Sequence, residues 1–274
     1  MTIGLMPVPD VTGYGIAEID KDMRISRFVE KPSPREAPSN LANTGLYLFS
    51  PKLREVFKEE KVQTMIENGR LDFGYDLIPY IVDSGRPVYG YTLKGAWYDV
   101  GTPERYLEAM HGMLRGQLKS LQDFGGRISN GATIWIQGES VESIERRKYL
   151  MRKVKEGKIE LEGSVLIGRH CEIGEGTRMA DSCIDNYARI GRNVTIEGSA
   201  IMDRVIIGDN AEIRGSIVGR HSTVKSSQAQ ATKILQTSVI ADDVTIEVGC
   251  QLVDTKIHPH IHVPKQEYSG RVIA

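Results

Sequence analysis

Four short segments near the N-terminus carry residue types that bind polar ligands. They are Gly13-Tyr14-Gly15, Phe28-Val29-Glu30-Lys31-Pro32, Asn43-Thr44-Gly45 and Trp97-Tyr98-Asp99-Val100-Gly101-Thr102-Pro103. Together they offer an open backbone amide, two carboxylates, a compact ammonium group and an amide that both donates and accepts hydrogen bonds. Each segment alone is a weak signal. Glu30 and Lys31 could form only a surface pair, and Asp99 could only shape the turn before Thr102.

The elements around these segments are predicted to be mixed α and β. Apolar runs at Ile25–Val29 and Leu46–Phe49 indicate strands, and each run precedes a proline. Leu77–Val82 indicates a helix that stops before a glycine and a proline. Thr102-Pro103-Glu104 is typical of a helix start, with a hydroxyl cap, a proline in the first turn and an acid at the positive end. We expect that helix to run to about Leu121.

The second half of the chain repeats with a fixed spacing. Ile173, Ile190 and Ile207 are each 17 residues apart, and a second series runs through Ile167, Ile184, Ile201 and Val218. Such a period predicts coils stacked on one another, and several coils are needed to bury a core. A glycine commonly follows the apolar residue, where we expect a corner with positive φ. A similar sequence motif recurs at 240–246, with Ile240 lying 33 residues after Ile207. We expect the polar stretch 225–233 between them to be a loop.

A helix is expected at Val141–Lys155, where apolar residues share one face and Arg146, Arg147 and other basic residues share the opposite face. A basic face could bind nucleic acid or a membrane, but a solvated linker helix is the favoured interpretation. The net charge is -1, and the sequence has no run of 18 apolar residues. We therefore expect neither nucleic acid nor membrane as a partner.

Three cysteines, Cys171, Cys183 and Cys250, fall inside the repeats. An odd number of cysteines argues against a disulfide framework and for a reducing compartment. We expect the three to be small buried residues and the protein to be cytoplasmic.

The N-terminal segments, in this order and followed by apolar-Gly-x-x-small-x repeats, resemble the sugar-phosphate nucleotidyltransferases, or NDP-sugar pyrophosphorylases, with a hexapeptide-repeat tail. The fold class that the resemblance implies is α/β, a partial Rossmann-like nucleotidyltransferase domain, plus an all-β left-handed parallel β-helix. The expected organisation is a C-terminal half of the nucleotidyltransferase domain at 1–110, a helical linker at 111–160, the β-helix at 161–264 and a tail at 265–274.

The implied activity joins a hexose 1-phosphate, with glucose or mannose as the sugar, to a nucleoside triphosphate and releases pyrophosphate. By resemblance, the substrate-binding residues are Gly15 beside the sugar, Glu30 and Asn43 on its hydroxyls, and Lys31 on the phosphate. Lys31 and Asp99 are the expected catalytic residues, and Asp99 is the expected ligand of Mg²⁺, which favours carboxylate and phosphate oxygens.

The family's glycine-rich nucleotide loop and its first metal-binding acid have no counterpart in this sequence, and residues 1–5 resemble the strand that follows that acid. We therefore expect a chain that is inactive alone, binds the triphosphate through a missing N-terminal half, and exposes apolar edges and faces that seek a cover. We also expect a homo-oligomer.

Two other functions stay open at this point. The first is a non-catalytic regulatory or assembly subunit that binds sugar phosphate. The second is a coenzyme A-dependent acyltransferase, for which the candidate bases are His170, His221, His258 and His260. His170 and His221 each follow Gly-Arg at the same place in their coil, and this regularity favours a structural role.

Overall fold

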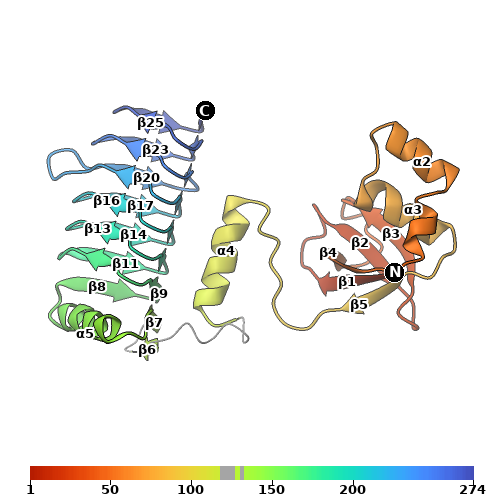
Figure 1. Cartoon of the computed structure of the whole chain (residues 1–274), viewed down its shortest axis with the longest axis horizontal. Coiled ribbons are helices and arrows are strands. Elements are labelled where there is room, and N and C mark those ends of the chain that lie inside the picture. The colour runs from red at the N-terminus through yellow and green to blue at the C-terminus, as the bar shows by residue number, and fades with distance from the viewer. Residues whose placement is uncertain (118–126, 130–132) are drawn as a thin grey trace. The chain divides into compact units, whose positions relative to one another are not determined.

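The structure is a computed structural model that describes residues 1–117, 127–129 and 133–274. The chain divides into two compact units, Met1–Trp97 and Tyr98–Ala274, each with its own core (Figure 1). The first unit is α/β and the second is a parallel β-solenoid with two helices in its described part, as the sequence predicts.

The first unit is built on a five-stranded sheet of order β3-β2-β4-β1-β5. Its elements are β1 (Thr2–Pro7), β2 (Gly15–Ile19), β3 (Ile25–Glu30), β4 (Leu41–Leu48), α1 (Leu53–Val56), α2 (Glu60–Glu67), the π-helix η1 (Phe73–Leu77), α3 (Ile78–Asp83) and β5 (Tyr89–Thr92). The expected strands and the expected helix are all present. The π-helix that leads into α3 is not predicted by the sequence pattern.

The two faces of this sheet differ. On one face Leu5, Ala17 and Phe28 pack in the same core as Leu77 and Ile78 of the helices. The opposite face carries Thr2, which pairs with Leu48 on one side and with Tyr89 on the other. It leaves apolar side chains open to solvent: Leu46 is 58% exposed, Leu48 73%, Tyr89 43% and Tyr91 60%. The expected exposed apolar surface is thus present on this face.

The solenoid has three parallel faces. The first is β10 (Glu172–Ile173), β13 (Arg189–Ile190), β16 (Ile206–Ile207), β19 (Thr223–Val224), β22 (Thr245–Ile246) and β25 (His262–Val263). The second is β8 (Ile159–Glu162), β11 (Thr177–Ala180), β14 (Thr195–Glu197), β17 (Glu212–Arg214), β20 (Lys233–Leu235), β23 (Gln251–Val253) and β26 (Glu267–Ser269). The third is β9 (Ser164–Ile167), β12 (Cys183–Ile184), β15 (Ala200–Ile201), β18 (Ile217–Val218), β21 (Val239–Ile240), β24 (Lys256–Ile257) and β27 (Val272–Ile273), extended by β7 (Thr133–Ile136) and β6 (Arg127–Ser129).

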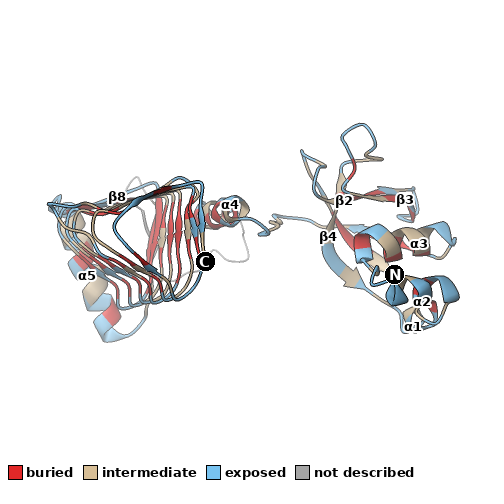
Figure 2. Ribbon diagram, turned by 90° about the horizontal axis from the view of Figure 1, so that it is seen from above, coloured by how far each residue is buried: buried red, intermediate tan, exposed pale blue. Residues whose placement is uncertain are grey.

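Both predicted apolar series are confirmed as columns of paired residues. Ile173, Ile190 and Ile207 pair in turn on the first face, and the series from Ile167 to Val218 pairs on the third. These residues belong to the solenoid core, and Figure 2 colours many residues along the coils as buried. Because each coil rests only on its neighbours, burial is shared along the stack.

Ile240 does not continue the column of Ile207, although the spacing of 33 residues is close to two periods. Ile240 pairs with Val218 on the third face, and the column of Ile207 continues through Val224 and Ile246. The reason is the loop at 225–232, which the sequence did predict. It lengthens that coil, so equivalent residues are 22 apart there and 17 apart in the preceding coils.

The glycines after the apolar residues serve close packing, not positive φ as expected. A Cβ on Gly174 would lie 2.6 Å from the carbonyl carbon of Gly191 in the next coil. The left-handed residue lies two positions after these glycines: it is Gly176 at φ 76° in this corner, and His170 at φ 57° and His221 at φ 59° in two other corners. The corner glycines therefore set the spacing between coils.

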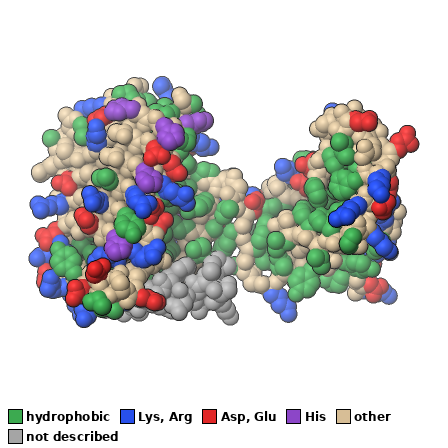
Figure 3. All heavy atoms as spheres, in the orientation of Figure 1, with side chains coloured by type: hydrophobic (Ala, Val, Ile, Leu, Met, Phe, Trp, Pro, Cys, Tyr) green, Lys and Arg blue, Asp and Glu red, His purple; other side chains and the backbone are tan. Residues whose placement is uncertain are grey.

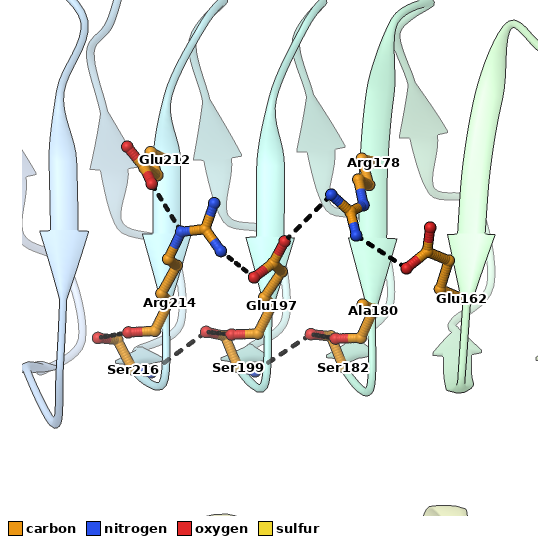
Figure 4. A network of polar contacts seen from close by, with 9 residues as sticks. All are labelled: Glu162, Arg178, Ala180, Ser182, Glu197, Ser199, Glu212, Arg214 and Ser216. Atoms are coloured by element: carbon orange, nitrogen blue, oxygen red, sulfur yellow. Dashed lines mark hydrogen bonds and ion pairs between the residues drawn. The ribbon is translucent and has the colours of Figure 1, made fainter.

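Polar side chains link the coils on the second face (Figure 4). Arg178 bridges Glu162 at 2.8 Å and Glu197 at 3.7 Å, and Arg214 continues the ladder by pairing with Glu197. Inside the adjoining corner the backbone N–H of Ser199 donates to the hydroxyl of the serine one coil earlier, at 3.1 Å. These exposed ion pairs each add little to stability, whereas the buried serine bonds satisfy backbone groups that water cannot reach. Figure 3 shows charges of both signs and histidines mixed over the solenoid surface.

Helix α4 (Pro103–Leu114) packs on the third face, where Leu107, Met110 and Leu114 share a core with Trp135 and Leu166. The predicted cap is confirmed, since Thr102 Oγ1 accepts a hydrogen bond from the N–H of Arg105 at 3.3 Å. The predicted end at Leu121 is wrong, because the helix stops at Leu114.

The reason for the early stop is Gly116, which has φ 76°, and whose N–H bonds the carbonyl of Met113 at 2.9 Å. A left-handed glycine after the last turn is a common way for a helix to end. The part of the expected helix beyond residue 117 lies outside the described residues.

Helix α5 has the predicted bounds, Val141–Lys155, and covers one end of the solenoid with Leu150, Met151 and Val154. Its basic face is partly structural, because Arg147 donates to the carbonyl of Ile136 at 3.0 Å. The range 111–160, expected as a linker, also contains β6, β7 and the start of β8, and the range 265–274, expected as a tail, contains β26 and β27.

Candidate functional site

The predicted binding residues of the first unit lie in one row across neighbouring strands. Gly15 at the start of β2 pairs with Glu30 at the end of β3. On the other side of β2, Ile16 pairs with Ala42, so that Asn43 follows one residue along β4 beside Gly15. Directly opposed residues point to the same face of a sheet. The structure thus brings Gly15, Glu30 and Asn43 together at one end of the helix-covered face.

The Glu30 side chain fills the space beside Gly15. A Cβ on Gly15 would lie 2.5 Å from Glu30 Oε2, and it would also strike the Phe28 ring. The absence of a side chain at Gly15 therefore makes room for Glu30 itself, whereas the resemblance had suggested room for a ligand. Burial raises the pKa of Glu30, the positive charge of Lys31 opposes this effect, and the negative charge of Asp72 adds to it.

Lys31 follows Glu30 in a left-handed conformation, with φ 46°. Its N–H donates to the carbonyl of Tyr14 at 2.9 Å, which fixes the turn. The side chain is exposed, and Nζ lies 5.8 Å from the centre of the Tyr75 ring. A left-handed lysine is uncommon and costs about 1 kcal/mol or more, so this backbone is held in place by its surroundings.

Asn43 is fixed by an irregularity in β4, where the pairing with β1 shifts between Ile3 and Leu5. Its Nδ2 donates to the hydroxyl of Tyr47 at 2.7 Å, and its Oδ1 accepts from the N–H of Gly45 at 3.0 Å. Gly45 has φ 77°, a conformation that glycine adopts without strain. The amide is thus oriented before any ligand binds.

Asp99 belongs to the second compact unit, so its surroundings are described apart from those of the other four residues. Its Oδ2 accepts a hydrogen bond from Arg105 Nη1 at 2.6 Å, and both side chains are about one third exposed, at 38% and 34%. Mg²⁺ prefers oxygen ligands and often takes only one or two carboxylates together with substrate phosphates. Asp99 fits as one such ligand through Oδ1. Among the described residues, no group of three or more His, Cys, Asp or Glu could hold a metal ion by itself.

Sequence reasoning missed the segment that covers Glu30 from the helical side. Asp72 Oδ1 accepts hydrogen bonds from the N–H groups of Gly74 and Tyr75, both at 2.8 Å, and so caps η1. A Cβ on Gly74 would lie 2.5 Å from the carboxyl carbon of Glu30. Asp is a favoured residue at the start of a helix, so Asp72 is a cap signal in the sequence, but nothing there links it to Glu30.

The solenoid residues considered for other chemistry have structural settings. His170 stacks on Tyr187 with ring centres 4.9 Å apart, and His170, His221 and His260 all have positive φ at coil corners. Burial raises the pKa of Cys171 to about 11 and that of Cys183 to about 12. Such thiols stay protonated at neutral pH and are poor nucleophiles. No helix within the described ranges is long and apolar enough to cross a membrane.

Two family models match the chain. Residues 1–116 match the nucleotidyl transferase family, and residues 146–252 match the EIF2B subunit epsilon LbH domain. A UTP–glucose-1-phosphate uridylyltransferase of Synechocystis sp. is 30% identical over 190 residues, which cover 67% of this chain and 46% of that protein.

Two glucose-1-phosphate adenylyltransferases are also similar. The protein of Fusobacterium nucleatum is 31% identical over 180 residues, covering 63% of this chain and 46% of its own length. The protein of Novosphingobium aromaticivorans is 29% identical over 230 residues, which cover 69% of this chain and 54% of that protein. The chain thus spans about half the length of the curated relatives that it matches. Residues 1–116 thus match the nucleotidyl transferase family, the solenoid is consistent with a left-handed β-helix domain, and the similar proteins are glucose-1-phosphate nucleotidyltransferases.

Proposed function

We propose that this chain forms the sugar-phosphate side of a nucleotidyltransferase that joins a hexose 1-phosphate, glucose or mannose 1-phosphate, to the nucleotidyl group of a nucleoside triphosphate. The observation that carries the proposal is the row of Glu30, Gly15 and Asn43 at one end of the sheet, with Lys31 next to it. The names of the relatives, all acting on glucose 1-phosphate, support the choice of substrate class.

Each residue of the row has a role in this proposal. The Glu30 carboxylate accepts hydrogen bonds from sugar hydroxyls, and Asn43 uses the rest of its amide capacity in the same way. The Lys31 ammonium group binds the phosphate of the sugar phosphate and holds one of its oxygens toward the α-phosphorus of the triphosphate. That oxygen forms the new bond as the bond to the pyrophosphate oxygen breaks, and pyrophosphate leaves with the electron pair.

Asp99 is proposed to act as a ligand of Mg²⁺. When bound, the metal would neutralise phosphate charge as the transfer proceeds. Arg105 holds the Asp99 carboxylate from one side, and this leaves Oδ1 to face a cation. One carboxylate gives a complete site only together with phosphates and further ligands.

The triphosphate-binding residues are proposed to come from polypeptide that is not part of this sequence, joined to it or supplied as a separate chain. The coverage of about half of each relative supports this arrangement. The exposed apolar face of the sheet also supports it, because contiguous apolar surface usually marks an interaction site. We further propose a homo-oligomer in the cytoplasm, and the three free cysteines support a reducing compartment.

The test is pyrophosphate release from a mixture of nucleoside triphosphate, glucose 1-phosphate and Mg²⁺. We expect no turnover by the isolated chain. We expect turnover after addition of an N-terminal nucleotidyltransferase segment from a relative, and loss of that turnover in Asp99→Ala. Robust turnover by the isolated chain would contradict the need for a second part.

A second candidate is a non-catalytic assembly or regulatory subunit that binds sugar phosphate with the same residues. The match of the solenoid to a domain of a complex subunit favours keeping this alternative. Restored oligomerisation without turnover in the same experiment would select it.

A further inference from the structure

The Glu30 carboxylate lies in a slot whose two walls are glycines. One wall is Gly15 on β2, and the other is Gly74 in the first turn of η1. A Cβ on either residue would overlap the Glu30 side chain, with 2.5 Å to Oε2 from Gly15 and 2.5 Å to the carboxyl carbon from Gly74. Real Cβ atoms do not approach this closely. The full length of the glutamate therefore fits only while both walls lack side chains.

Hydrogen bonds hold the backbone at Gly74 in place. Its N–H and that of Tyr75 are both held by Asp72 Oδ1, and the N–H of Asp72 in turn donates to Asp76 Oδ2 at 2.9 Å. Gly74 itself is buried and does not have positive φ. An alanine there would suit the helical backbone, so the requirement for glycine comes from Glu30 and not from the chain conformation.

The carboxylate in the slot is available to a ligand. Glu30 is half-buried, and over the ranges that the structure describes its carboxylate receives no hydrogen bond from a protein group. A half-buried carboxylate without donors is unfavourable in the free protein, and hydroxyl donors of a ligand would relieve that cost. For one ligand to bind both residues, the Glu30 carboxylate must reach the sugar while Lys31 binds the phosphate.

We propose that Gly74 is a positioning residue that sets how far the Glu30 carboxylate projects toward the sugar hydroxyls of the bound hexose 1-phosphate. The inference rests on the function proposed above. A side chain at Gly74 would push the carboxylate out of its slot and into the space that the sugar occupies. The phosphate, bound through Lys31, would be little affected.

The test is a double-mutant cycle on the full chain, with binding of glucose 1-phosphate and of inorganic phosphate measured by calorimetry. Gly74→Ala should weaken glucose 1-phosphate binding by about tenfold or more and leave inorganic phosphate binding within about twofold. Glu30→Asp alone should also weaken sugar phosphate binding. The pair Gly74→Ala with Glu30→Asp should bind better than Gly74→Ala alone, because the shorter acid withdraws from the new methyl group.

The outcomes separate the two proposals. If the wild-type chain does not bind glucose 1-phosphate, the proposed function fails. If it binds and Gly74→Ala has no effect, or weakens both ligands equally, the positioning role is refuted.

If Gly74→Ala proves too unstable for binding measurements, its effect on the thermal midpoint of unfolding is compared in two backgrounds, wild type and Glu30→Ala. In a Glu30→Ala background the alanine at residue 74 should then be tolerated, since the overlapping carboxylate is gone. An equal loss of stability in both backgrounds would refute the contact on which the inference depends.

Discussion

The Asp99 carboxylate accepts a hydrogen bond from the Arg105 guanidinium at 2.6 Å, across the turn that leads into α4. This pair joins the residue expected to bind the metal to the helix that packs on the solenoid. The observed role of this carboxylate is to hold the turn before Thr102, and the proposed second role is to present an oxygen to a cation. The roles can be separated by changing each partner in turn.

Arg105→Gln should cost at most about 1 kcal/mol of stability, because partly exposed ion pairs contribute about that much. In the enzyme completed with an N-terminal segment, Arg105→Gln should retain turnover. Asp99→Asn should lower the turnover rate about 100-fold or more without a change in stability. Pyrophosphate release and the thermal midpoint are the two measurements. Equal losses in both variants would mean that Asp99 acts only through the turn.

Glu30 should make sugar phosphate binding depend on pH. Its folded pKa is raised above the ordinary value of 4.5 by burial, so the ionised form is lost at a higher pH than for an exposed glutamate. Binding of glucose 1-phosphate should weaken as pH falls through that raised pKa. The ligand's own phosphate also titrates, so the comparison is with Glu30→Gln, in which the added weakening should disappear.

The same shift predicts an effect on stability. A carboxyl whose pKa is raised in the folded state favours folding below its unfolded pKa and loses that contribution as pH rises through the folded pKa. At neutral pH, Glu30→Gln should therefore be at least as stable as the wild type while it binds sugar phosphate less well. A thermal midpoint clearly below that of the wild type at pH 7 would contradict this account.

Lys31 should be responsible for the phosphate part of binding. Lys31→Ala removes a charge-assisted contact worth about 1.5–3 kcal/mol, so affinity for glucose 1-phosphate should fall about 10- to 100-fold. Lys31→Arg should retain part of the affinity for glucose 1-phosphate, because the positive charge is kept while its geometry changes. Calorimetry at two salt concentrations checks this, since the loss should be larger at low salt. Unchanged affinity in Lys31→Ala would remove Lys31 from the site.

The solenoid core should respond strongly to a single cavity. Ile196 is fully buried, and Ile196→Ala should cost about 2–5 kcal/mol in the solenoid transition. Ile206 lies nearby on an outer face at 44% exposure, and Ile206→Ala should cost less than about 0.5 kcal/mol. Differential scanning calorimetry gives both values. Similar shifts for the two variants would contradict the inward and outward assignment.

The parts of the fold that depend on local pattern could be predicted from the sequence. The columns of isoleucines, the bounds of α5 and the Thr102 cap are set by spacing and by neighbours within a few residues. The column to which Ile240 belongs depends on the length of the preceding loop, which changes the period, and the end of α4 depends on Gly116, a stop signal inside the expected helix.

The candidate site could be predicted only in part. Glu30, Lys31 and Asn43 were found through their resemblance to a family, and the pairing of β2 with β3 explains why Gly15 and Glu30 are neighbours. The contact of Gly74 with Glu30 joins residues 44 positions apart through tertiary packing, so no local pattern contains it. Asp99 stands in the other compact unit, and its relation to the row stays a prediction.

The glycines that let successive coils approach each other also give the solenoid a length proportional to its number of coils. Each coil advances the stack by about 4.8 Å, the ordinary spacing between paired strands. Duplicating or deleting one whole 17-residue coil would change the length of the domain by one such step while leaving each face of the remaining coils in register. The length of the solenoid could therefore change by one coil at a time, independently of the chemistry in the N-terminal part of the chain.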